Sequence, residues 1–142
     1  MQFYFCGSIR GGREKASFYR LLISRLREHG PVLTEHVGDD QTIETEGQEM
    51  DDIQIHDRDL DWIKASDVVV AEVSVPSLGV GYEIGRAIEM GKPVLCLFDL
   101  RSGNALSAMI AGCSQVFLKN YRSDEEAISK LEELLAEMKN SS

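Results

Sequence analysis

The stretch Asp67-Val68-Val69-Val70-Ala71-Glu72-Val73 decides the fold of this chain. After Asp67, its β-branched residues are interrupted only by Ala71 and Glu72, so a strand formed here has apolar side chains on both faces. Such a strand must be covered on both sides, as the central strands of parallel sheets are. We therefore take 68–73 as the centre of an α/β fold.

Strand and helix patterns alternate on both sides of this segment. Apolar residues recur at helical spacing in the longer segments, and glycine or proline often precedes the next strand. We predict strands over 2–6, 32–34, 68–73, 94–98 and 115–119, and helices over 14–29, 48–65, 79–90, 105–111 and 124–138. The pattern predicts one α/β domain over all 142 residues. The expected architecture is a flavodoxin-like (Rossmann-like), doubly wound, five-stranded parallel sheet with strand order 2-1-3-4-5.

The charge of the chain limits its partners. The formal net charge is -9, which repels polymeric nucleic acid and anionic membranes, because binding to either relies on basic patches. A small anionic ligand is still possible where backbone N–H groups and one or two arginines gather. No apolar run approaches the roughly 20 residues of a membrane helix. The first residues resemble a strand and not a signal peptide, so we expect a cytosolic protein that can also enter the nucleus.

Metal and cofactor motifs are absent from the sequence. The three cysteines are scattered without a CxxC pair, which argues against a disulfide framework and against zinc. The three histidines form neither HxH nor HExxH. There is no GxxxxGK[ST] motif, and Gly79-x-Gly81-x-x-x-Gly85 is one residue too long for the dinucleotide fingerprint. We expect no metal and no cofactor.

A phosphate site is predicted at the carboxyl ends of the strands, where open α/β sheets bind their ligands. The loops that reach this edge cover 7–12, 34–37, 74–81 and 100–107. The first of them, Gly7-Ser8-Ile9-Arg10-Gly11-Gly12, leads from a strand into a helix. Its N–H groups favour an anion, and the Arg10 guanidinium matches phosphate oxygens. Without Arg10, the glycines could equally reflect a tight turn.

The segment Ser77-Leu78-Gly79-Val80-Gly81-Tyr82-Glu83-Ile84-Gly85 begins the helix at the same edge. Glu83 is expected in about the first turn, where helix N–H groups stabilise an ionised carboxylate by roughly 0.3–1 kcal/mol. An ionised carboxylate that faces a cleft suits a displacement at an anomeric carbon. Acidic residues are also frequent at helix starts without any function, so position alone does not assign this role.

A second carboxylate candidate lies in His56-Asp57-Arg58-Asp59-Leu60-Asp61-Trp62. Most of these ionisable residues are expected on a solvated helix face, with Asp59 near the edge of the buried stripe. Spacing alone does not distinguish Asp59 from Asp57 or Asp61. His56 is interpreted as a packed or rim histidine.

Five segments together resemble a known enzyme family. They are Tyr4-Phe5-Cys6-Gly7-Ser8-Ile9-Arg10-Gly11-Gly12-Arg13-Glu14, Leu33-Thr34-Glu35-His36-Val37, Asp67-Val68-Val69-Val70-Ala71-Glu72-Val73, Pro76-Ser77-Leu78-Gly79-Val80-Gly81-Tyr82-Glu83-Ile84-Gly85-Arg86-Ala87 and Leu106-Ser107-Ala108-Met109-Ile110. In this order they closely resemble the 2'-deoxynucleoside 5'-phosphate N-hydrolases of the Rcl type, relatives of the nucleoside 2-deoxyribosyltransferases. The likeness weakens over 38–49 and after Gly112.

The resemblance implies hydrolysis of 2'-deoxynucleoside 5'-monophosphates to free base and 2-deoxyribose 5-phosphate, without metal or organic cofactor. Glu83 looks like the family nucleophile, which forms a deoxyribosyl phosphate ester. Asp59 is similar to the carboxylate that protonates the base or activates water, and Tyr4 matches the aromatic hydroxyl near the sugar. The expected nucleotide contacts are Gly7, Ser8, Ile9, Arg10, Ser77 and Gly79. The resemblance also implies a homodimer in which Ser107 and Met109 reach the neighbouring site.

Other functions stay open at this point. A nucleoside 2-deoxyribosyltransferase would share the glutamate and pass the sugar to another base, although the Arg10 loop favours a phosphorylated substrate. A ribonucleotide hydrolase is a further variant, because Tyr4 alone is a weak determinant of the sugar. A flavodoxin-like module could bind a nucleotide without cleaving it. A response-regulator receiver does not fit, since its acidic pair after the first strand is missing.

Overall fold

The computed structural model describes residues 1–9, 12–36 and 50–141. Its centre is a parallel five-stranded sheet in the order β2-β1-β3-β4-β5, with β3 in the middle as predicted. The strands are β1 (Phe3–Gly7), β2 (Val32–Leu33), β3 (Val68–Glu72), β4 (Val94–Asp99) and β5 (Val116–Tyr121). The helices are α1 (Gly12–Arg27), α3 (Asp52–Ala65), α4 (Leu78–Glu89), α5 (Ala108–Ala111) and α6 (Asp124–Asn140), with a 3-10 turn η2 (Leu100–Ser102).

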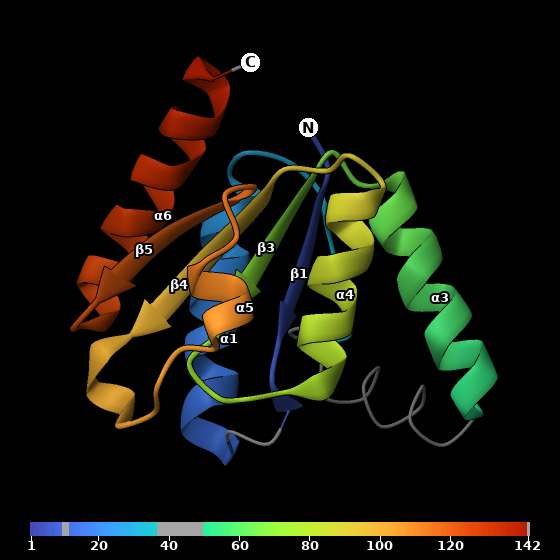
Figure 1. Ribbon diagram of the computed structural model, residues 1–142, viewed down its shortest axis with the longest axis horizontal. Helices are drawn as coiled ribbons and strands as arrows, with labels where there is room; N and C mark the ends of the chain where they lie inside the picture. Colours follow the sequence, from blue (N-terminus) through green and yellow to red (C-terminus); the bar gives the residue numbers. More distant parts are fainter. Residues whose placement is uncertain (10–11, 37–49, 142) are drawn as a thin grey trace.

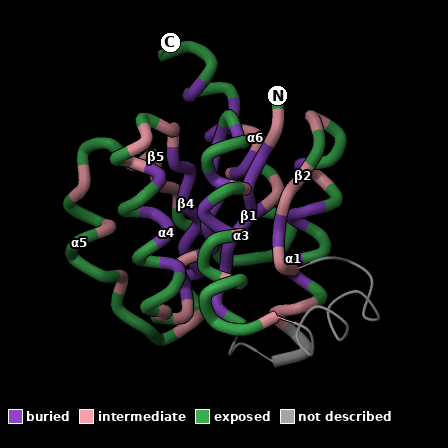
Figure 2. The backbone as a smooth tube through the Cα atoms, turned by 90° about the vertical axis from the view of Figure 1, so that its right-hand side faces the viewer, coloured by how far each residue is buried: buried purple, intermediate pink, exposed green. Residues whose placement is uncertain are grey.

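The two faces of the sheet build two apolar cores, because side chains alternate along each strand. Phe3 and Phe5 of β1 pack with α1 and α6 on one face. Tyr4 and Cys6 of the same strand pack with α3 and α4 on the other. Figure 1 shows α4 and α5 in front of the sheet and α1 behind it. The strands lie in the buried centre of the molecule, and the helices carry its exposed outer surface (Figure 2).

Several predicted boundaries move by a few residues for identifiable reasons. The helix expected over 105–111 begins only at Ala108, where the Ser107 hydroxyl accepts the Met109 N–H at 3.2 Å. The helix expected over 48–65 begins at Asp52, because Asp51 and Gln54 form a reciprocal capping box. β2 has two residues and pairs only with Phe3 and Tyr4. The exposed loop expected over 38–49 lies outside the described residues.

All five strands run in one direction, so their carboxyl ends form a single edge of the sheet. Figure 1 shows both chain termini at the opposite edge. No helix within the described ranges is long and apolar enough to cross a bilayer. The carboxyl edge is therefore where a ligand site is expected.

Candidate active site

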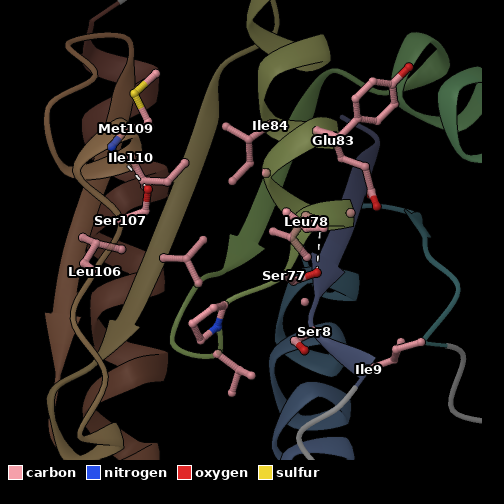
Figure 3. A pocket seen from close by; sticks show the side chains of 18 of the residues that line it. Ser8, Ile9, Ser77, Leu78, Glu83, Ile84, Leu106, Ser107, Met109 and Ile110 are labelled. Atoms are coloured by element: carbon pink, nitrogen blue, oxygen red, sulfur yellow. Dashed lines mark hydrogen bonds between the residues drawn. The ribbon is translucent and has the colours of Figure 1, made fainter.

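A cavity of about 900 Å³ opens at the carboxyl edge of the sheet. Its walls come from the turn after β1, from the start of α4 and from the segment before α5. Figure 3 shows Ser8 and Ile9 from the first of these walls, Ser77 and Glu83 from the second, Ser107 from the third, and Met109 from α5 itself. The cavity brings together most of the predicted nucleotide contacts, which are Gly7, Ser8, Ile9, Ser77, Gly79, Ser107 and Met109.

Helix α4 positions Glu83 on the cavity wall. The Ser77 hydroxyl caps the helix by accepting the Val80 N–H at 3.2 Å. Glu83 is the sixth residue of the helix and is 8% exposed. A Cβ on Gly79 would lie 3.9 Å from Glu83 Oε1, so this glycine lies directly beside the carboxylate. Glu83 thus lies in the second turn, just beyond the expected position in about the first turn, and its carboxylate faces the cavity.

Burial changes the protonation of Glu83 from what the sequence suggested. Desolvation raises the pKa of the Glu83 carboxyl to about 7, against the lowering effect of its hydrogen bond from Tyr4. The helix N-terminus was expected to favour the ionised form. That effect fades beyond the first turn, whereas loss of water acts on the whole carboxylate. The Glu83 carboxyl is therefore partly protonated near neutral pH.

Tyr4 holds the carboxylate of Glu83 from the sheet side. Its hydroxyl donates a hydrogen bond of 2.5 Å to Glu83 Oε2, and its side chain is fully buried in β1. Burial, together with the nearby Glu83 charge, raises the pKa of the Tyr4 hydroxyl far above its usual value. The tyrosine thus remains a hydrogen-bond donor, and it fixes one carboxylate oxygen of Glu83.

Two further carboxylates converge on Glu83. Glu35, Asp59 and Glu83 each place one carboxylate oxygen within 4.8 Å of the other two. Asp59 is 6% exposed on α3, and Glu35 lies just beyond β2 and lines the cavity. Arg58 contributes the positive charge, with its Nε 3.0 Å from Asp59 Oδ1. Glycosidases that form a covalent intermediate also hold two carboxyl groups close together, about 5 Å apart.

The turn after β1 is held by aromatic residues. A Cβ on Gly7 would lie 2.8 Å from Tyr19 Cζ, so a larger residue there would force the buried Tyr19 ring to move. The Tyr19 hydroxyl donates to the Ser8 carbonyl at 3.1 Å, and His36 Nε2 donates to the Gly7 carbonyl at 2.8 Å. Burial lowers the pKa of His36, which favours the neutral ring. These contacts fix two carbonyl groups of the predicted phosphate turn, while Arg10 lies outside the described residues.

Comparison with known proteins gives the family. The family model described as nucleoside 2-deoxyribosyltransferase matches residues 3–133. The chain belongs to this family. Within the nucleoside 2-deoxyribosyltransferase family, it is similar to proteins named 5-hydroxymethyl-dUMP N-hydrolase. The one from Mus musculus is 59% identical over 113 residues, which cover 78% of this chain and 65% of the mouse protein. The one from Danio rerio is 52% identical over 129 residues, 88% of this chain and 90% of the fish protein.

Solved structures agree with the fold of the nucleoside 2-deoxyribosyltransferase family. A CMP N-glycosidase from Clostridium botulinum superposes with a TM-score of 0.67 at 24% identity, over 93% of this chain and 99% of that chain. A 2-deoxyribosyltransferase from Bacillus psychrosaccharolyticus gives a TM-score of 0.66 at 16% identity, over 89% of each chain. At these identities the likeness establishes the doubly wound sheet.

Ser107 and Met109 were expected to act across a homodimer interface. In the structure they line the cavity of their own chain, and Met109 is 83% exposed. Ser107 is 3.2 Å from the Met109 N–H that it caps. The homodimer arrangement stays a prediction for this member of the nucleoside 2-deoxyribosyltransferase family.

Sequence reasoning missed Glu35, Arg58, His36 and Tyr19 as site residues. The segment 34–37 was recognised as one of the loops at the carboxyl edge, which was the available signal for Glu35 and His36. Arg58 was counted among the solvated charges of its helix, yet its side chain is only 17% exposed. Tyr19 gave no signal beyond a helical apolar pattern. None of these residues is close in sequence to Glu83, so only the fold brings them together.

The three carboxylates are also the group of described residues that could hold a metal ion. Carboxylate oxygens suit Mg²⁺ and Mn²⁺. Arg58 already supplies positive charge to Asp59 and Glu35, and a displacement by a carboxylate nucleophile, as the resemblance implies, requires no Lewis acid. We therefore predict that an excess of EDTA changes the rate of base release by less than about twofold, whereas loss of a required metal would abolish it. The measurement is base release before and after dialysis against the chelator, and activity restored only by added Mg²⁺ would contradict the prediction.

Proposed function

We propose that this protein hydrolyses the N-glycosidic bond of 2'-deoxynucleoside 5'-monophosphates, releasing the free base and 2-deoxyribose 5-phosphate. One observation carries the proposal. The Glu83 carboxylate, accompanied by other carboxylates within 4.8 Å, faces a cavity that also contains the glycine turn after β1. The cluster of carboxylates suits chemistry at an anomeric carbon, and the glycine turn after β1 suits a phosphate on the same sugar.

The reaction has two steps at C1' of the sugar. In the first, a Glu83 oxygen forms a bond to C1' as the bond to the base nitrogen breaks, and the base leaves with a proton from the carboxylate cluster. In the second, water attacks C1', its proton returns to the cluster, and Glu83 is released as a carboxylate. The Tyr4 hydrogen bond orients Glu83 in both steps. A substrate without a 2'-hydroxyl reaches the oxocarbenium-like transition state more easily, which favours deoxynucleotides.

The relatives support the same class of substrate. Proteins that are 52% and 59% identical to this chain are named for hydrolysis of 5-hydroxymethyl-dUMP, a deoxynucleoside monophosphate. The turn that would hold the phosphate is constrained in this chain by Tyr19 and His36. A cavity of about 900 Å³ is large enough for one mononucleotide.

The test is a panel of nucleotides assayed for base release by chromatography. The panel contains deoxynucleoside monophosphates including 5-hydroxymethyl-dUMP, the matching ribonucleotides and the unphosphorylated deoxynucleosides. We expect free base and 2-deoxyribose 5-phosphate from the deoxynucleotides above all. A second free base is added in one arm. A new nucleotide or nucleoside product in that arm would identify a transferase, and binding without cleavage of any compound would identify a nucleotide-binding module.

Arg10 is predicted to anchor the phosphate. Its loss in Arg10→Ala removes a charge-assisted contact, so KM for deoxynucleoside monophosphates should rise by about tenfold with little change in kcat. Arg27→Ala, at the exposed end of α1, is the matched control and should behave as the wild type. Steady-state kinetics with the phosphorylated substrate give both constants, and an effect confined to kcat would contradict phosphate anchoring.

A further inference from the structure

We propose that Ser74, anchored by Glu72, is a positioning residue that holds two walls of the cavity at the spacing that a nucleotide needs. Neither residue lines the cavity, and neither belongs to the carboxylate cluster around Glu83. The role of Ser74 in catalysis rests on the hydrolase function proposed above. It extends the site to a buried network behind the cavity walls.

Glu72 is a buried anchor at the carboxyl end of β3. It shares the sheet face of Val70, which packs with α1 and α6, and it is 1% exposed. Its Oε1 accepts the Ser74 N–H at 2.8 Å, and its Oε2 accepts the Ser74 hydroxyl at 2.8 Å and the Tyr121 hydroxyl. Burial raises the pKa of Tyr121 well above its usual value, so this hydroxyl remains a donor. Both carboxyl oxygens of Glu72 therefore serve as fixed acceptors, on the face opposite to α4.

Two cations accompany the acidic groups of this network. Lys15 Nζ lies 3.8 Å from Glu72 Oε2 and 3.8 Å from Asp99 Oδ2. Arg101 donates from Nε to Asp99 Oδ1 at 3.0 Å. Burial tends to raise the pKa of Asp99, but its hydrogen bonds from Arg101 hold that pKa below its usual value. Both cations are thus paired with carboxylates, which suits a network that holds geometry better than a second anion site.

Ser74 is fully buried and uses all of its polar groups. Its N–H and hydroxyl donate to Glu72. Its Oγ accepts the Asp99 N–H at 2.7 Å, and its carbonyl accepts Asn104 Nδ2 at 2.8 Å. Asp99 ends β4, and Asn104 follows the 3-10 turn η2 and Gly103, whose φ of 75° turns the chain back. The loop after β4 is therefore closed on Ser74 from both of its ends.

The two segments that meet at Ser74 each continue into a wall of the cavity. Three residues after Ser74, Ser77 caps α4, and Pro76 between them restricts the backbone. Directly after Asn104, residues 105–107 line the cavity from the other segment. Figure 3 shows side chains of both walls. The contacts of Ser74 therefore set where the start of α4 stands relative to the segment before α5.

Glu83 is held independently of these contacts. Its Oε2 accepts the Tyr4 hydroxyl of β1 at 2.5 Å, and α4 packs on the sheet through its own apolar residues. Loss of a contact at Ser74 should displace a binding wall and leave the nucleophile in place, so KM rises while kcat is largely kept. A residue that only stabilises the fold would instead lower the fraction of active protein, which lowers the apparent kcat at an unchanged KM.

The first test is Asn104→Ala, which removes one link to Ser74 at an exposed residue. We expect KM for 5-hydroxymethyl-dUMP to rise by about tenfold, with kcat within about threefold of the wild type. The midpoint of thermal unfolding should change little. Asn140→Ala, at the exposed end of α6, is the matched control and should keep the wild-type KM. An unchanged KM in Asn104→Ala, or a lower kcat at an unchanged KM, would overturn the proposal.

The Ser74 hydroxyl is tested by a pair of variants. Ser74→Ala removes the group that joins Glu72 to the Asp99 N–H, so KM should rise at least as much as in Asn104→Ala. Ser74→Thr keeps a hydroxyl at the same position and should recover most of the wild-type KM. A threonine variant that performs no better than the alanine variant would exclude the hydroxyl from the positioning role.

Binding to an inactive protein separates this role from the hydrolase function. In the Glu83→Gln background, the Kd of 5-hydroxymethyl-dUMP measured by calorimetry should rise by about tenfold when Asn104→Ala is added. This rise, together with a wild-type protein that releases no base, would support the positioning of the walls and refute the hydrolase function. Base release by the wild type with an unchanged Kd in the double variant would overturn the positioning role alone.

Discussion

Replacement of Glu83 by glutamine is expected to lower the turnover number for deoxynucleotide hydrolysis by about a thousandfold or more. The amide is not a nucleophile and cannot form the ester with C1'. Its oxygen can still accept the hydrogen bond of Tyr4, which is 2.5 Å from Glu83 Oε2 in the wild type, so the geometry of α4 should persist. The rate of base release under saturating substrate measures the effect.

The same experiment includes its own control. Glu89→Gln changes an exposed glutamate of the same helix and should leave the turnover number unchanged. Acid-quenched wild-type enzyme should carry the mass of a deoxyribose phosphate on the peptide that contains Glu83, and the Glu83→Gln variant should not. A variant that retains more than about a tenth of the wild-type rate would exclude Glu83 as the nucleophile, since loss of a nucleophile is among the largest single-residue effects.

The fold could be predicted because its decisive signals are local. Val68, Val69 and Val70 require cover on both faces of one strand, and this alone places them in the centre of a parallel sheet. The alternation of the remaining segments then leaves few topologies. The shortest elements were the least predictable: β2 is only two residues long, and its pairing with Phe3 and Tyr4 depends on β1 rather than on its own sequence.

The candidate site could be predicted only in part, because it depends on contacts between distant segments. The resemblance assigned Glu83, Asp59 and Tyr4, and the structure brings these three together. The protonation of Glu83 could not be read from helix position, since burial outweighs the effect of the helix N-terminus. Glu35 lies 48 positions before Glu83, and no spacing rule relates the end of one strand to the second turn of a later helix.

The rate of hydrolysis is expected to depend steeply on pH below neutrality. Glu83 acts as a nucleophile only when ionised, and burial raises its pKa to about 7 in the free enzyme. The value of kcat/KM should therefore fall about tenfold for each pH unit below about 7, so that at pH 5 it is about a hundredfold below its maximum. An ordinary glutamate would instead give an acid limb near its reference pKa of about 4.3.

The substrate phosphate itself titrates near pH 6, so a measurement without substrate is needed to assign the limb to Glu83. Folding stability provides it. Because the folded pKa lies above the unfolded one, the folded state binds the proton more tightly, and this stabilising contribution is lost as pH rises from about 4.5 through 7. The Glu83→Gln variant has no titrating carboxyl group at this position, so its folding stability does not show this loss. The free energy of unfolding of the variant should therefore exceed that of the wild type by an amount that grows across this window, on the order of 3 kcal/mol at most. A difference independent of pH would show that Glu83 titrates normally and that the acid limb belongs to the substrate.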